Sequence, residues 1–182
     1  HDARPIFSPT AVPTLAPPAA PTAGPTLDPN WVIFNATSAS QAPSSGISRP
    51  ASNCTDGVLT GADGDLCTPE AVNAWFQIDL GESKPVSMVR FYNIHADGFQ
   101  FRFNSHQIWV SDSATDPTSG TKCFEGTAPS IYGPIDEACS GTGRYVRVVK
   151  TEAGYKPLYL HEVQVMGPAP TPAPTVSPTD AP

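Results

Sequence analysis

Proline recurs at every fourth residue near both ends of the chain. The positions are Pro5, Pro9, Pro13, Pro17, Pro21, Pro25 and Pro29, and then Pro170, Pro174, Pro178 and Pro182. Proline fixes φ and lacks an amide donor, so these stretches favour an extended, polyproline-like conformation and cannot supply a central strand. Of the 22 prolines, only eight fall between residues 31 and 166. We therefore expect one domain, 31–166, between two extended tails, 1–30 and 167–182.

Threonine follows many of the tail prolines. These threonines are Thr10, Thr14, Thr22, Thr26, Thr171, Thr175 and Thr179. Tracts rich in Thr and Pro are typical of O-glycosylated stalks, and we expect sugars at these positions. Two roles for the tails stay open. They are simple stalks or linkers, or a groove or neighbouring subunit binds the row of prolines that an extended chain places on one face.

Four cysteines form two local couples separated by a long gap. They are Cys54 with Cys67 and Cys123 with Cys139. No pair has the C-x-x-C spacing of a zinc site, so we expect two disulfides, one within each couple. Disulfides persist in oxidising compartments, which predicts an extracellular protein, either secreted or part of a cell-surface coat.

Two triplets have the form of N-glycosylation sequons. They begin at Asn35 and Asn53, with Thr37 and Thr55 at the third positions. We expect both asparagines to be acceptor sites.

Charge and hydropathy exclude two classes of partner. The formal net charge of −7 argues against nucleic acid and anionic membrane surfaces. No apolar run is long enough to span a bilayer.

Alternating apolar and polar residues predict strands in the middle of the chain. Trp75–Leu80 and Val86–Ile94 are predicted as a hairpin with its turn at Gly81–Pro85. Further strands are predicted at 31–34, 105–113, 145–149 and 158–166, with loops and turns at 38–73 and 114–143. Short strands without a helical period predict an all-β fold, an antiparallel β-sandwich.

Five segments occur in the order seen in discoidin-like, galactose-binding-like domains. They are Trp75–Leu80, Pro85–Val86, Gln107–Ser111, Gly143–Val146 and Leu160–Val165. Within that group the chain resembles the F-type lectins (fucolectins) over nearly all of 31–166. The resemblance implies a jelly-roll sandwich with a disulfide that matches Cys123–Cys139.

The resemblance also implies a sugar site. F-type lectins bind sugar with an upstream His, then Arg-x-Asp, then a further Arg or Lys. Asp97 and Arg102 match this pattern, His95 stands where the family has Arg, and no His occurs near residues 69–70. The candidate carbohydrate-binding residues are His95, Asp97, Phe99 and Arg102, with Phe101 as an alternative stacking ring. The alternative is an exposed loop whose charges are solvated.

A calcium site is the second implication of the resemblance. Its candidate ligands are Asn53, Asp56, Val58, Thr68, His161 and Glu162, with Val58 and His161 contributing backbone carbonyls. Such hard oxygen ligands suit Ca²⁺. Glu162 also shares the strand parity of Leu158 and Leu160, so it should point inward, where an unpaired carboxylate is costly. The alternative is a buried Glu162 paired with Arg or Lys.

Enzyme function is not predicted, because the acidic and histidine side chains stand in no recognisable catalytic motif. Two functions remain. The first is a subunit of an extracellular filament or surface coat, in which copies of the chain join head to tail through glycosylated tails; the regular tails favour it. The second is a calcium-dependent carbohydrate-binding lectin or adhesion module, with glycans as partners.

Overall fold

The computed structural model describes residues 28–42, 49–67, 69, 71, 73–96, 98–152 and 157–169. Most of both predicted tails, with all seven predicted O-glycosylated threonines, lies outside the described residues, as do Thr68 and Asp97. The strands are β1 (Trp31–Phe34), β2 (Ser38–Gln41), β3 (Trp75–Asn93), β4 (Ser105–Ser111), β5 (Thr121–Thr127), β6 (Ile135–Lys150) and β7 (Leu160–Pro168). The 3-10 helices in the described part are η1 (Ala51–Cys54), η2 (Asp63–Asp65), η3 (Gln100–Arg102) and η4 (Pro117–Ser119).

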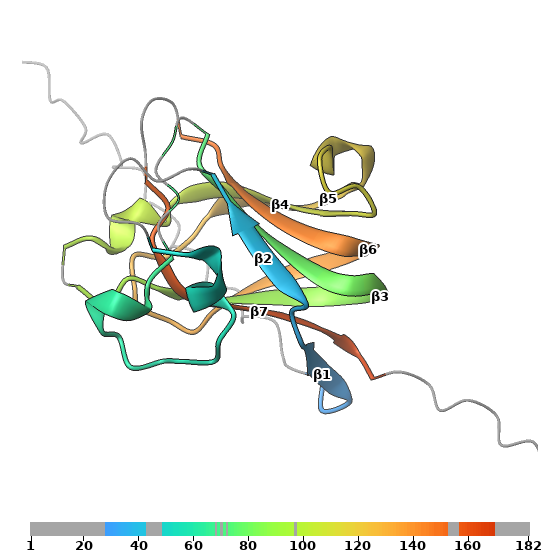
Figure 1. Cartoon of the computed structure of the whole chain (residues 1–182), viewed down its shortest axis with the longest axis horizontal. Coiled ribbons are helices and arrows are strands. Elements are labelled where there is room, and N and C mark those ends of the chain that lie inside the picture. Colours follow the sequence, from blue (N-terminus) through green and yellow to red (C-terminus); the bar gives the residue numbers. More distant parts are fainter. Residues whose placement is uncertain are drawn as a thin grey trace, which may run out of the picture.

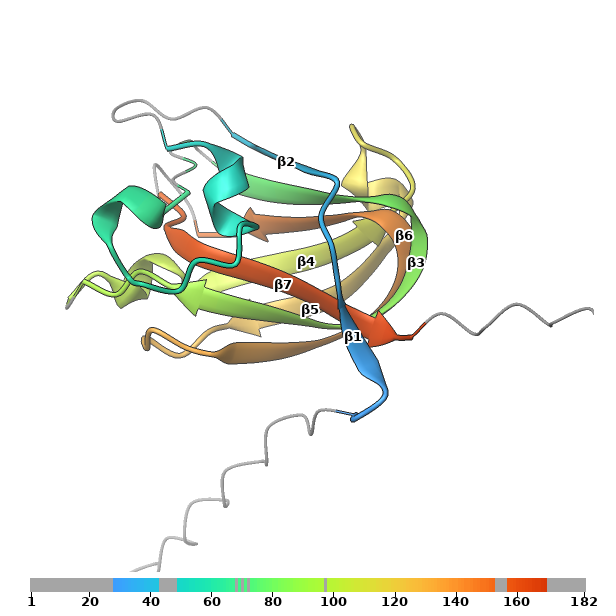
Figure 2. The ribbon, with the colours of Figure 1, turned by 60° about the horizontal axis from the view of Figure 1, so that its bottom comes forward.

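Two long strands, β3 and β6, run through both layers of the sandwich. They pair with each other in antiparallel fashion, with register shifts near the middle of β3. The first half of β3 pairs with β2, while its second half pairs with β7. β4 pairs with the second half of β6 and with β5, whereas β1 pairs with β7. One layer therefore extends from β2 to β5 and the other contains β1 and β7, as Figures 1 and 2 show. This antiparallel sandwich is the predicted fold.

The predicted hairpin at 75–94 is wrong, because β3 is a single strand of 19 residues. Asp79 pairs with Tyr145 and Lys84 pairs with Gly143, so the stretch between Asp79 and Lys84 is longer than the matching stretch of β6. Such an irregularity bends a strand and does not reverse it. Within this irregular stretch, Gly81 has φ +80° and its backbone amide donates a hydrogen bond to Asp79 Oδ1 at 2.8 Å. Glycine and proline mark both turns and bulges, which is why the sequence pattern was ambiguous.

Three strand segments lie in regions predicted as loops and turns. They are β2, β5 and the first half of β6. β2 and β5 are largely exposed or half-buried, so they lack the strong apolar alternation that reveals a strand. The predicted strands at 31–34, 105–113, 145–149 and 158–166 are confirmed to within a few residues, except that 145–149 is only the end of the longer β6.

The core between the layers is apolar. Both predicted disulfides are present and pack in or against it. The fully buried large side chains of the core include Phe76, Phe91, Phe103, Ile108 and Leu160. Cys54 and Cys67 are bonded with a Cα–Cα distance of 5.5 Å, which closes the loop that follows η1 and contains η2. Cys123 and Cys139 are bonded with a Cα–Cα distance of 4.7 Å, which links β5 to β6.

The chain enters and leaves the sandwich at the same corner. Trp31 at the start of β1 pairs with Pro168 at the end of β7. Just beyond, the Ala169 amide donates to the Asn30 carbonyl at 3.2 Å. Both Pro/Thr-rich segments are therefore attached to one edge of the domain. In the described part of the chain, no helix is both long enough and apolar enough to cross a membrane.

Candidate functional site

Loops from distant parts of the chain gather at one end of the sandwich. β3 ends where loop 94–104 begins, and β6 begins where loop 128–134 ends. Loop 51–67, whose residues 54–67 are closed by the disulfide, joins the same end, because Cys67 forms a β-bridge with Leu160 at the start of β7. Figure 2 shows these segments beside one another. Antiparallel pairing of β3 with β6 and β7 brings these three loops together.

Arg102 lies between two aromatic rings at this end. Its guanidinium carbon is 4.7 Å from the centroid of Phe99 and 4.5 Å from that of Tyr159. Cation–π contacts of this kind hold a guanidinium in place while its N–H groups remain donors. Phe99 is 43 % exposed and Phe101 is 51 % exposed. The loop therefore offers a positioned cation and exposed aromatic faces.

The buried Lys150 side chain holds the backbone of this loop in place. The Arg102 carbonyl accepts a hydrogen bond of 2.6 Å from Lys150 Nζ, and Lys150 also forms an ion pair of 3.3 Å with Glu152. A small pocket of about 140 Å³ is lined by these residues together with Phe101 and Pro157. The buried lysine thus fixes the end of η3 on which Arg102 is carried.

His95 belongs to the same loop but has different neighbours from Arg102. Its ring lies 5.0 Å from the ring of Tyr132, edge to face, and its carbonyl accepts from Gln100 Nε2 at 3.4 Å. Gly61 of the disulfide-closed loop also lies beside the His95 ring. His95 is therefore positioned by loops 51–67 and 128–134.

Sequence reasoning missed Tyr132 and Tyr159 as parts of the site. Tyr159 carried a usable signal, because Leu158 and Leu160 on either side are buried and its own ring must face outward. Tyr132 carried none, since it stands in a turn-rich segment without periodicity.

Glu162 is buried as expected, but the face that strand parity predicts for it is wrong. Leu160 pairs with Asn93 and Glu162 pairs with Tyr92, so a register shift separates them, and Val163 and Val165 are the core residues that follow. Glu162 therefore lies on the opposite face of β7, where loop 51–67 covers it.

The Glu162 side chain is only 4 % exposed. Burial, with a smaller contribution from the Asp56 charge, raises the pKa of Glu162 to about 7, against the opposing effect of the Gly57 amide. That amide donates to Glu162 Oε2 at 3.3 Å. Among the residues that the structure describes, no Lys or Arg forms an ion pair with Glu162.

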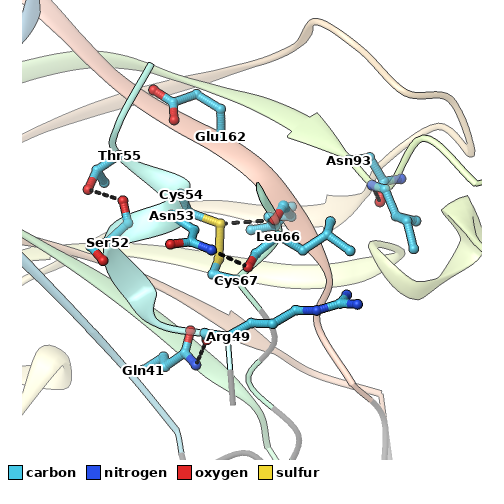
Figure 3. Close-up of a disulfide and its surroundings, with 12 residues drawn as sticks. Gln41, Arg49, Ser52, Asn53, Cys54, Thr55, Leu66, Cys67, Asn93 and Glu162 are labelled. Carbon is cyan, nitrogen blue, oxygen red and sulfur yellow. Dashed lines mark hydrogen bonds between the residues drawn. A yellow bond between two sulfur atoms is a disulfide. The ribbon is translucent and has the colours of Figure 1, made fainter. Parts of the chain in front are cut away.

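The loop opposite Glu162 presents oxygen atoms in a fixed backbone. Asn53 Nδ2 donates to the carbonyls of Gly64 at 2.9 Å and Leu66 at 3.2 Å, and Asp56 Oδ1 accepts from the Val58 amide at 2.9 Å. Figure 3 shows Asn53 beside the Cys54–Cys67 disulfide, with Glu162 above it. Within the described ranges, no three His, Cys, Asp or Glu side chains gather to hold a metal. The oxygens here come from two carboxylates, an amide and main-chain carbonyls.

An open cleft of roughly 410 Å³ adjoins these groups. Asn35, Asp56, Glu162 and Gln164 contribute polar atoms to its lining, and β1 contributes Phe34. One sequon asparagine therefore borders the same cleft as the two carboxylates. His161, the remaining candidate ligand, has a fully buried side chain, and its ring packs 5.7 Å from that of Tyr132.

Residues 53–148 match the family model of the NedA-like, galactose-binding domain. The chain belongs to this family. The matched range covers β3, β4 and β5, both disulfide couples, most of β6 and loops 94–104 and 128–134, whereas β7 with Glu162 lies beyond it. No curated protein matches the sequence of this galactose-binding domain.

Solved lectin domains share its fold. A fucolectin from the serum of striped bass (Morone saxatilis) is 26 % identical with a TM-score of 0.61, over 72 % of this chain and 45 % of the fucolectin. This chain thus spans less than half of that protein. A histidine mutant of the lectin-binding domain of lectinolysin, complexed with Lewis b, is 24 % identical with a TM-score of 0.60, over 80 % of this chain and all of that domain. A Streptococcus pneumoniae fucose-binding module is 24 % identical with a TM-score of 0.58, over 74 % and 96 % of the two chains. The predicted galactose-binding-like fold and the resemblance to F-type lectins are confirmed.

Proposed function

We propose that this domain is an extracellular lectin module that binds glycans through loop 94–104. The observation that carries the proposal is the position of Arg102 between Phe99 and Tyr159 at the loop end of the sandwich. A guanidinium supplies several N–H donors to sugar hydroxyls, and an exposed aromatic ring supplies a flat apolar face for the C–H side of a sugar. The two oxidised disulfides fit an extracellular setting.

The sugar preference should differ from that of typical F-type lectins. His95 stands where the family has Arg, and an imidazole cannot reproduce the paired donors of a guanidinium. His95 instead packs on Tyr132, which places a single ring nitrogen donor or acceptor beside the loop. Two of the structurally similar proteins, the lectinolysin domain and the Streptococcus pneumoniae module, bind Lewis b and fucose respectively. Fucosylated glycans are therefore the first probes to use.

Glycan-array and calorimetric binding of the full chain test this function. Arg102→Ala should weaken binding at least tenfold, and Phe99→Ala should weaken it by a similar factor because the guanidinium loses its support. Lys84→Ala is the matched control, since Lys84 also lies over a ring, that of Phe34, but on the bend of β3. Phe101→Ala tests the alternative stacking face. Binding that survives Arg102→Ala unchanged would remove loop 94–104 as the site.

We further propose that a calcium ion braces loop 51–67 against β7. The donors would be the carboxylates of Asp56 and Glu162, Asn53, Thr68, and the carbonyls of Val58 and His161. Support comes from the buried Glu162, whose charge has no basic partner among the described residues and lies close enough to Asp56 for their charges to oppose each other. A divalent cation would compensate both charges, and an all-oxygen set suits calcium.

A second candidate function is a subunit of an extracellular filament or surface coat. It is favoured by the pairing of Trp31 with Pro168, which attaches both Pro/Thr-rich segments to one edge. The segments could then associate with copies of the chain, while the sandwich projects to the side. Sedimentation velocity and electron microscopy of the full chain and of residues 28–169 test this function. Assembly should require the tails, and equal assembly by both proteins would refute a connecting role.

A further inference from the structure

Tyr132 contacts three separate parts of the loop end. Its hydroxyl donates to the Leu59 carbonyl of loop 51–67 at 3.2 Å. Its ring lies 5.0 Å from that of His95 in loop 94–104 and 5.7 Å from that of His161 in β7, edge to face in both cases. One side chain therefore connects the oxygen-rich loop, the candidate sugar loop and the strand that carries Glu162.

Asn93 holds the loop of Tyr132 to the sugar loop. This fully buried side chain donates from Nδ2 to the carbonyls of Gln100 at 2.8 Å and Ile131 at 3.1 Å. The Asn93 amide donates to the Tyr132 carbonyl at 2.6 Å, and Asn93 Oδ1 accepts from the Ile94 amide at 2.8 Å. Breaking these hydrogen bonds would leave buried polar groups of Asn93 without partners, which is costly. Loops 94–104 and 128–134 should therefore move as one unit.

The Tyr132 hydroxyl joins that unit to loop 51–67 through its hydrogen bond to Leu59, and Gly61 of loop 51–67 also lies beside the His95 ring. Leu59 lies a few residues after Asp56 and Gly57. The Gly57 amide donates to Glu162, and the Asp56 carboxylate accepts from the Val58 amide. Anything that fixes Asp56 and Glu162 relative to each other also fixes the Leu59 carbonyl a few residues away. Tyr132 then carries that restraint to the His95 ring.

We infer that Tyr132 is a positioning residue that couples divalent-cation binding by loop 51–67 to the arrangement of sugar loop 94–104. The inference rests on the proposed glycan and calcium sites and specifies how one regulates the other. Coupling of this kind is reciprocal, so calcium should tighten glycan binding by the same factor by which glycan tightens calcium binding.

The first test measures Lewis b tetrasaccharide affinity of the full chain in CaCl₂ and in EDTA. Calcium should tighten binding about fivefold or more, at the lower end of typical couplings. Tyr132→Phe, which keeps the ring but loses the bond to Leu59, should lose most of the calcium gain, measured as the ratio of its affinities in CaCl₂ and in EDTA. Tyr145→Phe, which changes a tyrosine on β6 next to Arg144, should retain that gain. If the parent chain binds the tetrasaccharide with the same affinity in CaCl₂ and in EDTA, or if Tyr132→Phe shows an equal gain, the inference is overturned.

The second test needs no glycan. Calcium titration should shift the NMR signals of both the His95 and His161 imidazoles in the parent chain. In Tyr132→Phe the His161 signal, next to Glu162, should still shift and report metal binding, while the His95 signal should stay in place. A chain that binds no glycan but shows this difference would refute the lectin function and keep the coupling. A His95 signal that ignores calcium in the parent, or follows it in Tyr132→Phe, would refute the coupling itself.

Discussion

The amide of Gly57 donates a 3.3 Å hydrogen bond to Oε2 of Glu162, which joins loop 51–67 to β7 across 105 residues of sequence. This bond meets a carboxyl group whose pKa burial has raised to about 7. One amide does not offset the loss of water around the charge, so the folded chain without metal holds a proton on Glu162 more tightly than the unfolded chain does.

Without a divalent cation, the free energy of unfolding should therefore fall as pH rises from about 4.5 to 7. The stabilisation is complete below the ordinary Glu pKa and is lost as pH passes the raised one. Glu137, whose pKa burial also raises to about 7, adds a decrease of the same sign. His106, whose pKa burial lowers to about 4, adds an increase over the same pH range, which the two glutamates together outweigh. Each group contributes on the order of 1–3 kcal/mol. Urea unfolding in EDTA at a series of pH values measures the slope. Glu162→Gln and Glu137→Gln should each flatten part of it, and a slope unchanged by Glu162→Gln would contradict the assignment.

Calcium should raise the melting temperature at neutral pH, because an ion that binds only the folded chain stabilises it by mass action. At 100 times the dissociation constant the gain is about 2.7 kcal/mol. Glu162→Gln should abolish the effect, while Glu137→Gln, a buried glutamate on β6, should leave it intact. Differential scanning calorimetry in CaCl₂ and EDTA provides the measurement. A parent chain whose melting curve is the same in both would eliminate the metal site.

Strand parity predicted the core residues Phe76 and Ile78 but not the surroundings of Glu162. A period of two fixes which face a residue occupies only while the strand stays regular, and the register shift after Leu160 moves Glu162 to the face opposite Val163. Loop contacts carry no such period. Tyr132, Asn93 and Leu59 meet only because β3, β6 and β7 bring their loops to one end, which no local pattern encodes.

The strand errors have a similar origin. The sequence identified strands that alternate between core and solvent, but it missed β2 and β5, which lie near the edges and bury few apolar side chains. The continuity of β3 was also missed, because the bend at Gly81 depends on pairing with a distant strand, β6.

The two sequons should differ in occupancy. Both hydrogens of the Asn53 amide are directed at carbonyls, those of Gly64 and Leu66, and an N-linked sugar replaces one of them. Asn35 is exposed beside the open cleft and has room for a glycan. We expect Asn35 to be glycosylated and Asn53 unmodified in secreted, folded protein. Mass spectrometry after enzymatic deglycosylation in ¹⁸O-labelled water shows which asparagine gains the label. Full labelling at Asn53 in folded protein would contradict the expectation.

Gly81, on the bend of β3, should be costlier to replace than Gly98 of loop 94–104. Its φ of +80° already disfavours other residues, and an added Cβ would lie 2.6 Å from Thr37 Oγ1. Gly98 has nearly the same φ, +79°, with no atom within 4 Å of an added Cβ, so it measures the backbone cost alone. Gly98→Ala should cost about 1 kcal/mol and Gly81→Ala about 2 kcal/mol, judged by urea unfolding. The clash with Thr37 is tested by making Gly81→Ala in a chain that already carries Thr37→Ala. In that chain Gly81→Ala should lower the free energy of unfolding by only as much as Gly98→Ala does. If the double variant loses as much stability as the two single variants together, Thr37 does not limit the space at the bend.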